Sequence, residues 1–258
     1  MTSFQDVFKR TEIKYLLTEE QYRALRERLT GIARVDKYGE TDILNIYYDT
    51  PDYRLIRDSL MKPVYKEKLR LRTYGTPKDG TAVSFIEIKK KYKGIVYKRR
   101  IDAPLHAAER YLSGRGELLQ RSQIKSEIDS MLAQYPGIRP AMAISYSRIA
   151  MAGIEDSELR ITFDKNIRWR TDNLNLYAGP KGEDILAPGQ YLMEMKIKDA
   201  FPLHLSRILS ELGIFPISFS KYGRGYEIMT ARALAAGVNT VYAGSFAISG
   251  EKGEVAYA

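Results

Sequence analysis

The stretch YKEKLRLRTYG at residues 65–75 alternates between basic and mainly apolar side chains. Successive side chains of a β-strand point to opposite faces, so this alternation predicts a strand with two very different faces. One face would carry Lys66, Lys68, Arg70 and Arg72, and the other Glu67, Leu69, Leu71 and Thr73. The fold must therefore place an unbroken cationic face where water or an anionic partner can meet it.

The same alternation recurs in other segments that have the pattern of strands. Their polar faces carry Arg10, Glu12 and Lys14; Glu87, Lys89 and Lys91; Lys98 and Arg100; Tyr146 and Arg148; Arg160, Thr162 and Asp164; and Glu194, Lys196 and Lys198. A solvated face of an antiparallel sheet would explain any one of them. Solvated faces usually mix both signs, however, because like charges opposite one another on neighbouring strands are destabilising. The predominance of Lys and Arg in strand after strand favours a shared cationic surface.

Amphipathic helices indicate on which side of the sheet this surface lies. Segments 19–29, with Thr18 as the N-cap, and 202–212 each have an apolar side that needs a surface to pack on. If the apolar strand faces point outward to receive these helices, the cationic faces point inward, and a closed barrel of about eight strands has room for a lumen. We therefore predict an α+β fold, an eight-stranded antiparallel β-barrel with flanking helices.

The individual elements follow from the same patterns. Strands are predicted over 8–17, 43–50, 65–75, 82–92, 95–102, 141–151, 158–169 and 191–198, with a hairpin at Lys93–Gly94. Two more helices are predicted between Pro104 and Gln134, and another closes the fold within 220–234, where residues 223–225 are predicted as a turn before it. We expect one domain over residues 1–236 and a flexible C-terminal tail over 237–258.

The composition narrows the ligand to a polyanion. Lys and Arg number 41 against 32 Asp and Glu, which gives a formal net charge of +9. The chain has no Cys and only two His, which excludes disulfides and thiolate zinc sites and argues against histidine metal clusters and Ser–His–Asp catalysis. With no signal-like N-terminus and no stretch near the ~18 apolar residues of a membrane span, we expect a cytoplasmic chain without a membrane segment. The lumen would be too narrow for double-stranded nucleic acid but would suit a nucleoside triphosphate or polyphosphate. A carboxylate among the cations could hold a divalent metal on the phosphate oxygens of such a ligand.

Nine segments occur in the order found in one known family: RTEIKYLL, IYYDT, KLRLRTYG, FIEIKKK, YKRRI, ISYSR, LRITFD, LMEMKIK and FSKYGRG. Over residues 8–230 the chain resembles the catalytic domain of vacuolar transporter chaperone (VTC) proteins, which are polyphosphate polymerases of the triphosphate tunnel metalloenzyme superfamily. The resemblance implies an eight-stranded antiparallel tunnel that transfers the γ-phosphoryl of ATP to a growing polyphosphate chain, releases ADP and requires Mn²⁺ or Mg²⁺.

The resemblance also implies roles for individual residues. The matches to the phosphate-binding cations of the family are Lys14, Arg70, Arg72, Lys89, Lys98, Arg148 and Lys221; Tyr146 and Ser220 match its hydroxyl donors, and Glu194 its metal-binding glutamate. Further candidates for substrate binding on the same faces are Arg10, Arg160 and Lys196. Glu194 could instead form a structural ion pair, while Glu12 and Glu87 could either orient lysines or contact the metal through water.

Two departures from the family pattern leave the activity open. Hydrolytic members of the superfamily begin with Glu-x-Glu-x-Lys, whereas Arg10 stands first here, and the missing carboxylate argues against a second metal and against activation of water. Ser218 stands where polymerases of the family tend to carry a lysine, which bears on chain length, affinity or activity. Three functions remain: the polymerase, a metal-dependent triphosphatase of inorganic triphosphate or a nucleoside triphosphate, and a non-catalytic module that binds polyphosphate, inositol phosphates or RNA. The sequence predicts no oligomeric state.

Overall fold

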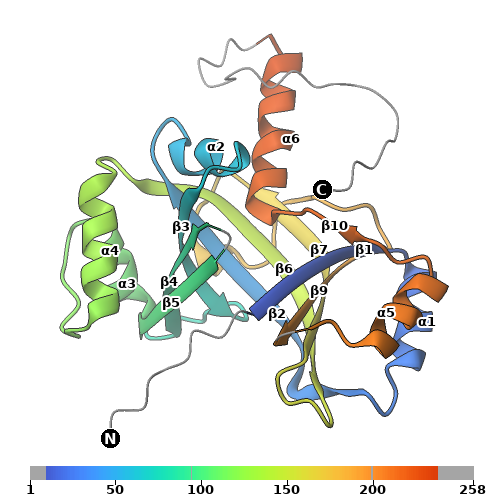
Figure 1. Cartoon of the computed structure of the whole chain (residues 1–258). Coiled ribbons are helices and arrows are strands. Elements are labelled where there is room, and N and C mark those ends of the chain that lie inside the picture. The colour runs from blue at the N-terminus through green and yellow to red at the C-terminus, as the bar shows by residue number, and fades with distance from the viewer. Residues whose placement is uncertain (1–9, 94, 199, 238–258) are drawn as a thin grey trace, which may run out of the picture.

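The computed structural model describes residues 10–93, 95–198 and 200–237, and its main feature is a large antiparallel sheet (Figure 1). The eight long strands are β1 (Arg10–Leu17), β2 (Ala33–Asp49), β3 (Tyr65–Tyr74), β4 (Val83–Tyr92), β5 (Ile95–Pro104), β6 (Arg139–Gly153), β7 (Arg160–Arg170) and β9 (Tyr191–Lys198). Two short strands, β8 (Glu183–Asp184) and β10 (Pro216–Ile217), pair with β7 and β1. The predicted Gly94 of the hairpin and the tail beyond Gly237 lie outside the described residues.

In the described part of the chain, six α-helices accompany the sheet. They are α1 (Glu19–Arg28), α2 (Arg54–Leu60), α3 (Leu105–Leu112), α4 (Gln123–Gln134), α5 (Leu203–Glu211) and α6 (Lys221–Ala235), with a 3₁₀ turn at Leu176–Ala178. The predicted N-cap is confirmed, because the Thr18 side chain accepts from the backbone N–H of Gln21 while the Gln21 side chain accepts from that of Thr18. Within the described part of the chain, no helix combines the length and apolar character needed to cross a membrane.

The structure agrees only in part with the predicted closed barrel. The paired strands follow the order β10-β1-β9-β7-β6-β2-β3-β4-β5, and no ladder joins β5 back to β1 among the described residues. One reason is that β10 already pairs with part of the free edge of β1, at Lys14 and Tyr15. The side chains of β1 and β4 still meet, since Lys89 Nζ lies 3.7 Å from Glu12 Oε1. The fold is therefore α+β with one large antiparallel sheet, in which β1 and β4, each next to an end strand, approach through side chains.

The apolar strand faces carry the helices, as the amphipathic patterns predicted. One core joins α1 and α5 to β1, β7 and β9, with Leu25 and Leu209 packed near Phe163 and Met193. A second core lies under α3 and α4 on the β2–β5 side of the sheet. Figure 1 shows these two helix pairs on opposite flanks of the sheet. The alternate strand residues, which include most of the basic ones, are therefore directed away from both helix-covered cores.

A third core occupies one end of this opposite face and corrects two expectations. Residues of β2, β6 and β7 pack there against Tyr222 and Tyr226 of α6, so the inner face is apolar at this end rather than cationic throughout. The predicted turn at 223–225 is wrong, because these residues lie inside α6. A Cβ at Gly225 would come within 2.6 Å of Met142 Sδ, so glycine allows the helix to approach β6 closely.

Candidate functional site

The basic side chains of β3 lie on the face opposite its core residues. Leu69 and Leu71 are fully buried in the core under α3 and α4, so strand alternation places Arg70 on the other face. The register then pairs Arg70 directly with Glu87 of β4. The face predicted from residues 65–75 is confirmed, and its neighbours are carboxylates as well as cations.

Glu87 is the centre of the first charged network. Its side chain is 1% exposed, its Oε2 lies 2.6 Å from Arg70 Nη2 and 3.6 Å from Arg72 Nε, and its Oε1 lies 2.7 Å from Lys98 Nζ. Burial raises the pKa of Glu87, but Arg70, Arg72 and Lys98 outweigh burial and hold that pKa at about 2. Burial lowers the pKa of Lys98 to about 8, and Glu87 offsets this only partly. Glu87 therefore remains ionised and holds three cations in place.

Asp164 of β7 is the centre of a second network. Arg148 donates from Nε and Nη2 to its two oxygens at 2.6 and 2.8 Å, and Lys221 Nζ lies 2.6 Å from Oδ2. Both cations also lie against the ring of Tyr146, at 5.2 and 4.5 Å from its centroid. The Tyr146 hydroxyl accepts from Arg72 at 3.1 Å, which makes the first two networks continuous. Sequence reasoning missed Asp164, although it placed this residue on a polar strand face.

The third network joins β1, β9 and β4. Lys14 Nζ lies 2.8 Å from Glu12 Oε1 and 4.0 Å from Glu194 Oε2, while Lys196 Nζ lies 2.9 Å from Glu194 Oε1 and 3.8 Å from Glu12 Oε2. Burial raises the pKa of Glu194, but the nearby lysines, Lys196 first among them, hold it well below its usual range. Burial and Glu194 raise the pKa of Glu12, and Lys89 and Lys14 bring it below its ordinary value. Both carboxylates are thus available as ionised oxygen ligands.

Glu12 and Glu194 fit a divalent metal better than Glu87 does. The two glutamates share two lysines and so lie side by side, and Thr162 faces Glu194 across the β7–β9 ladder with its buried Oγ1 lacking a hydrogen-bond partner. Mg²⁺ is usually held by one or two carboxylates together with substrate phosphates and water. Both oxygens of Glu87 lie within 2.7 Å of a cation, whereas the nearest lysine nitrogens lie 3.8 Å from Glu12 Oε2 and 4.0 Å from Glu194 Oε2. Among the described residues, no group of three or more His, Cys, Asp or Glu side chains could hold a metal ion.

Three more polar residues contact the predicted site and were missed. Lys68 Nζ donates to Ser220 Oγ at 3.1 Å, and burial lowers the pKa of Lys68 to about 8. The Tyr47 hydroxyl accepts a hydrogen bond from Arg70 at 3.0 Å, and Asn45 Oδ1 accepts one from Arg72 Nε at 2.8 Å. Lys68 belongs to the basic face read from the sequence, whereas nothing in the sequence pairs β2 residues with these arginines.

The structure brings most of the predicted site residues together. All seven predicted phosphate-binding cations belong to the three networks. Tyr146 contacts Arg72, Arg148 and Lys221, while Ser220 accepts a hydrogen bond from Lys68. Lys196 joins the third network. Arg160 is exposed and is not among the residues of the three networks, whereas the side chain of Arg10 lies outside the described part of the structure, although its backbone pairs with Lys198 at the start of β1.

Comparison with known proteins gives a family and a fold. Residues 9–230 match the VTC domain. No curated protein matches significantly. A putative adenylate cyclase from Bacillus halodurans is 14% identical, with a TM-score of 0.51 over 81% of this chain and 92% of that one, which shows a shared fold. Weaker likenesses include a putative adenylate cyclase from Vibrio parahaemolyticus (15% identity, TM-score 0.45, covering 86% and 98%) and the Mimivirus capping enzyme triphosphatase (9% identity, TM-score 0.34, covering 78% and 88%). Since the domain match spans most of the sequence, the chain belongs to the VTC domain family.

Proposed function

We propose that this chain is an ATP-dependent polyphosphate polymerase, which transfers the γ-phosphoryl of ATP to a growing polyphosphate chain and releases ADP. One observation carries the proposal: eight cations from six strands and a helix converge on buried or half-buried carboxylates in three neighbouring networks. In each network the cations outnumber the carboxylates, so the region attracts a polyanion. Membership of the VTC family supports triphosphate or polyphosphate as that polyanion.

The proposal includes a tunnel surrounded by the eight long strands. On the side where strand pairing stops, the ion pair between Lys89 and Glu12 spans from β4 to β1. The hydrogen bond from Lys68 to Ser220 brings the start of α6 against β3. A linear phosphate chain between these contacts would attract the basic side chains on both sides, so the tunnel would be enclosed without another β-ladder.

The geometry suits phosphoryl transfer, which needs mainly positioning and charge stabilisation on the equatorial oxygens. Arg148 and Arg70 are each held by a buried carboxylate, which fixes their orientation before substrate arrives. Arginine offers planar donors for bidentate binding of phosphate, and the surrounding lysines supply compact charge. No covalent nucleophile is needed, because the terminal phosphate of the polyphosphate chain attacks the γ-phosphorus and ADP leaves.

We assign Glu194 and Glu12 as the residues that would hold Mn²⁺ or Mg²⁺, with Thr162 beside them. The metal would neutralise charge on the phosphate oxygens as a Lewis acid. Glu87, which binds three cations, orients them instead.

The decisive experiment incubates the purified chain with ATP and Mn²⁺ and follows both products. Long polyphosphate on a gel with stoichiometric ADP is the expected result. Orthophosphate without polyphosphate would replace the proposal with a triphosphatase. A rise in melting temperature with triphosphate, but no turnover, would leave a binding module.

A variant tests the metal assignment within the same assay. Glu194→Gln is expected to abolish turnover while phosphate still binds, because the cationic networks stay in place. The matched control is Glu117→Gln, since Glu117 is an exposed glutamate far along the chain from the predicted site residues. Unchanged turnover in Glu194→Gln would remove this residue from the metal site.

A further inference from the structure

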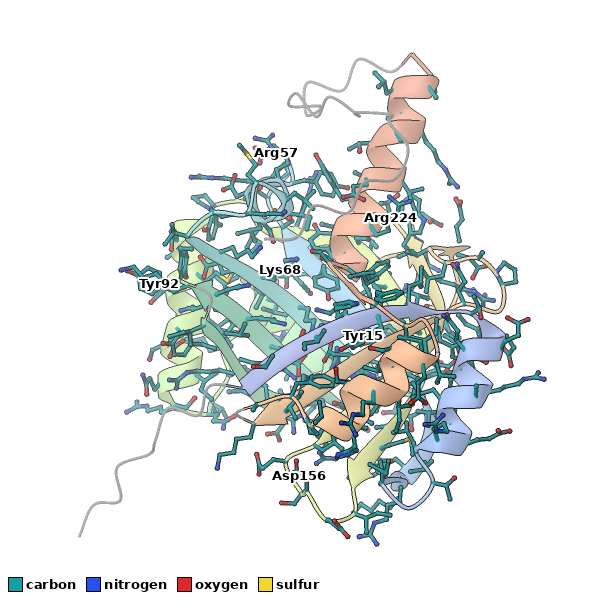
Figure 2. All side chains as sticks on the ribbon, turned by 45° about the vertical axis from the view of Figure 1, so that its right-hand side comes forward. Tyr15, Arg57, Lys68, Tyr92, Asp156 and Arg224 are labelled. Atoms are coloured by element: carbon teal, nitrogen blue, oxygen red, sulfur yellow. The ribbon has the colours of Figure 1, made fainter. Side chains whose placement is uncertain are left out.

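The loop between β3 and β4 forms a cavity that the three charged networks do not explain. The cavity has a volume of about 450 Å³, which is within the range of small-molecule sites, and it is lined by residues 73–79, residues 81–83 and Phe85. It lies at the far end of β3 from Lys68, which Figure 2 shows close to α6. Among the described residues, no member of the three networks lines this cavity.

The cavity continues the strand face that carries the network of Glu87. Strand alternation places Tyr74 on the same face of β3 as Arg72, about 7 Å further along the strand. The ladder between β3 and β4 places Phe85 directly opposite Arg72. A ligand whose phosphates bind Arg70 and Arg72 can therefore extend its other end into the cavity.

An aromatic platform stands where the cavity meets this network. The rings of Tyr74 and Phe85 lie edge to face, with their centroids 5.6 Å apart and an interplanar angle of 80°. Arg100 of β5 covers Phe85, with its Cζ 4.7 Å from the ring centroid. Tyr74 itself is 49% exposed. A tyrosine ring that is supported on one side and open on the other offers a surface on which a planar heterocycle stacks.

The charges around the cavity balance, unlike those of the networks. The ionisable side chains at its wall and beside Phe85 are Lys78 and Arg100 on one side and Asp79 and Asp102 on the other. Asp79 accepts hydrogen bonds from the N–H and the hydroxyl of Thr81, which fixes the loop before a ligand arrives. A further phosphate group would find no excess of positive charge here. An uncharged planar group with polar edges suits the cavity better.

We propose that this cavity is a nucleobase subsite, in which the adenine of ATP stacks on Tyr74 beside Phe85 and Arg100 while its phosphates bind the cations of the networks. The inference rests on the proposed function for the identity of the ligand, but its test measures binding and needs no turnover. In this orientation ADP leaves from the Tyr74 end of β3. Stacking tolerates any base, so the subsite adds affinity for a nucleotide over inorganic triphosphate rather than selecting adenine strictly.

The test compares the affinities of ATP and of inorganic triphosphate by calorimetry, without divalent metal so that neither ligand is turned over. Tyr74→Ala removes the stacking ring, and Tyr38→Ala removes another exposed tyrosine, on β2, as the matched control. Tyr74→Ala is expected to weaken ATP binding by about tenfold and triphosphate binding by less than about twofold, because a ring is lost but no charge. Tyr74→Phe keeps the ring and should bind ATP as the unmodified chain does. Circular dichroism checks that each variant is folded.

Three results would overturn the inference. ATP affinity in Tyr74→Ala equal to that of the control variant would leave the ring without a role in binding. Equal weakening of ATP and triphosphate would show that Tyr74 acts on the cations rather than on a base. An unmodified chain that binds triphosphate but not ATP would have no nucleobase subsite.

Failure of the proposed function shows elsewhere, as the absence of polyphosphate synthesis by the unmodified chain. A folded Tyr74→Ala variant that loses affinity for ATP but not for triphosphate supports the inference whichever way that synthesis assay ends.

Discussion

Glu87 offers the sharpest test of how the cationic face is stabilised. The change Glu87→Gln keeps the size of a side chain that is 1% exposed and removes the charge shared by Arg70, Arg72 and Lys98. Three cations then remain together without their counter-charge. Breaking a buried ion pair by removing one partner typically costs several kcal/mol, because the remaining charge is left uncompensated.

The size of the effect follows from the pKa of Glu87. A pKa of about 2, against an ordinary value of 4.5, corresponds to about 3 kcal/mol of stabilisation at neutral pH. Because the pKa in the folded state is depressed, this contribution is complete above pH 4.5 and is lost as the pH falls towards 2. For a chain of this size, about 3 kcal/mol lowers the melting temperature by roughly 6–12 °C.

Urea unfolding at pH 7 and pH 3 measures this contribution directly, with Glu117→Gln as the control. The difference between wild type and Glu87→Gln should be large at pH 7 and smaller at pH 3. Triphosphate should restore part of the lost stability, since the freed cations bind it more tightly and binding to the folded state stabilises by mass action. A variant as stable as wild type at pH 7, or one that triphosphate fails to stabilise, would refute the electrostatic reasoning.

Three further predictions concern the same region. Triphosphate affinity should fall as the pH rises above 8, because Lys68 and Lys98 bind phosphate as cations and their pKa values are about 8. The fall should reach up to about tenfold per pH unit for each lysine involved. Calorimetry from pH 7 to 9 measures this affinity, and Lys98→Arg should flatten the pH profile. Gly225→Ala should lower the melting temperature despite its better helix propensity, since the new Cβ would meet Met142 Sδ at 2.6 Å; an unchanged or higher value would contradict the close approach. Tyr222→Phe, which loses its hydrogen bond to a buried aspartate, should cost about 1 kcal/mol in urea unfolding, and no loss would show that this bond does not anchor α6.

Much of the fold was predictable because strand alternation is a local property. The period of two assigned Leu69 and Leu71 to one face and Arg70 to the other, and the amphipathic helices showed which face they cover. The long strand β2 was predicted only over residues 43–50, because the side chains of residues 34–42 are exposed or half-buried and show no regular alternation of burial. The turn predicted at residues 223–225 was wrong, since glycine there serves a close helix–strand contact that has no local signal.

The amino-acid sequence by itself determined which residues are cationic, on which strand faces they lie and, through nine ordered segments, the family to which they belong. Only the tertiary structure decided their partners: Asp164 between Arg148 and Lys221, Glu87 among three cations, and Lys68 at the start of α6. It also decided that β1 and β4, each next to an end strand of the sheet, meet through side chains. The physical reason is that a side chain's face follows from its immediate neighbours, whereas its partners depend on strand order, register and helix docking between residues far apart along the chain.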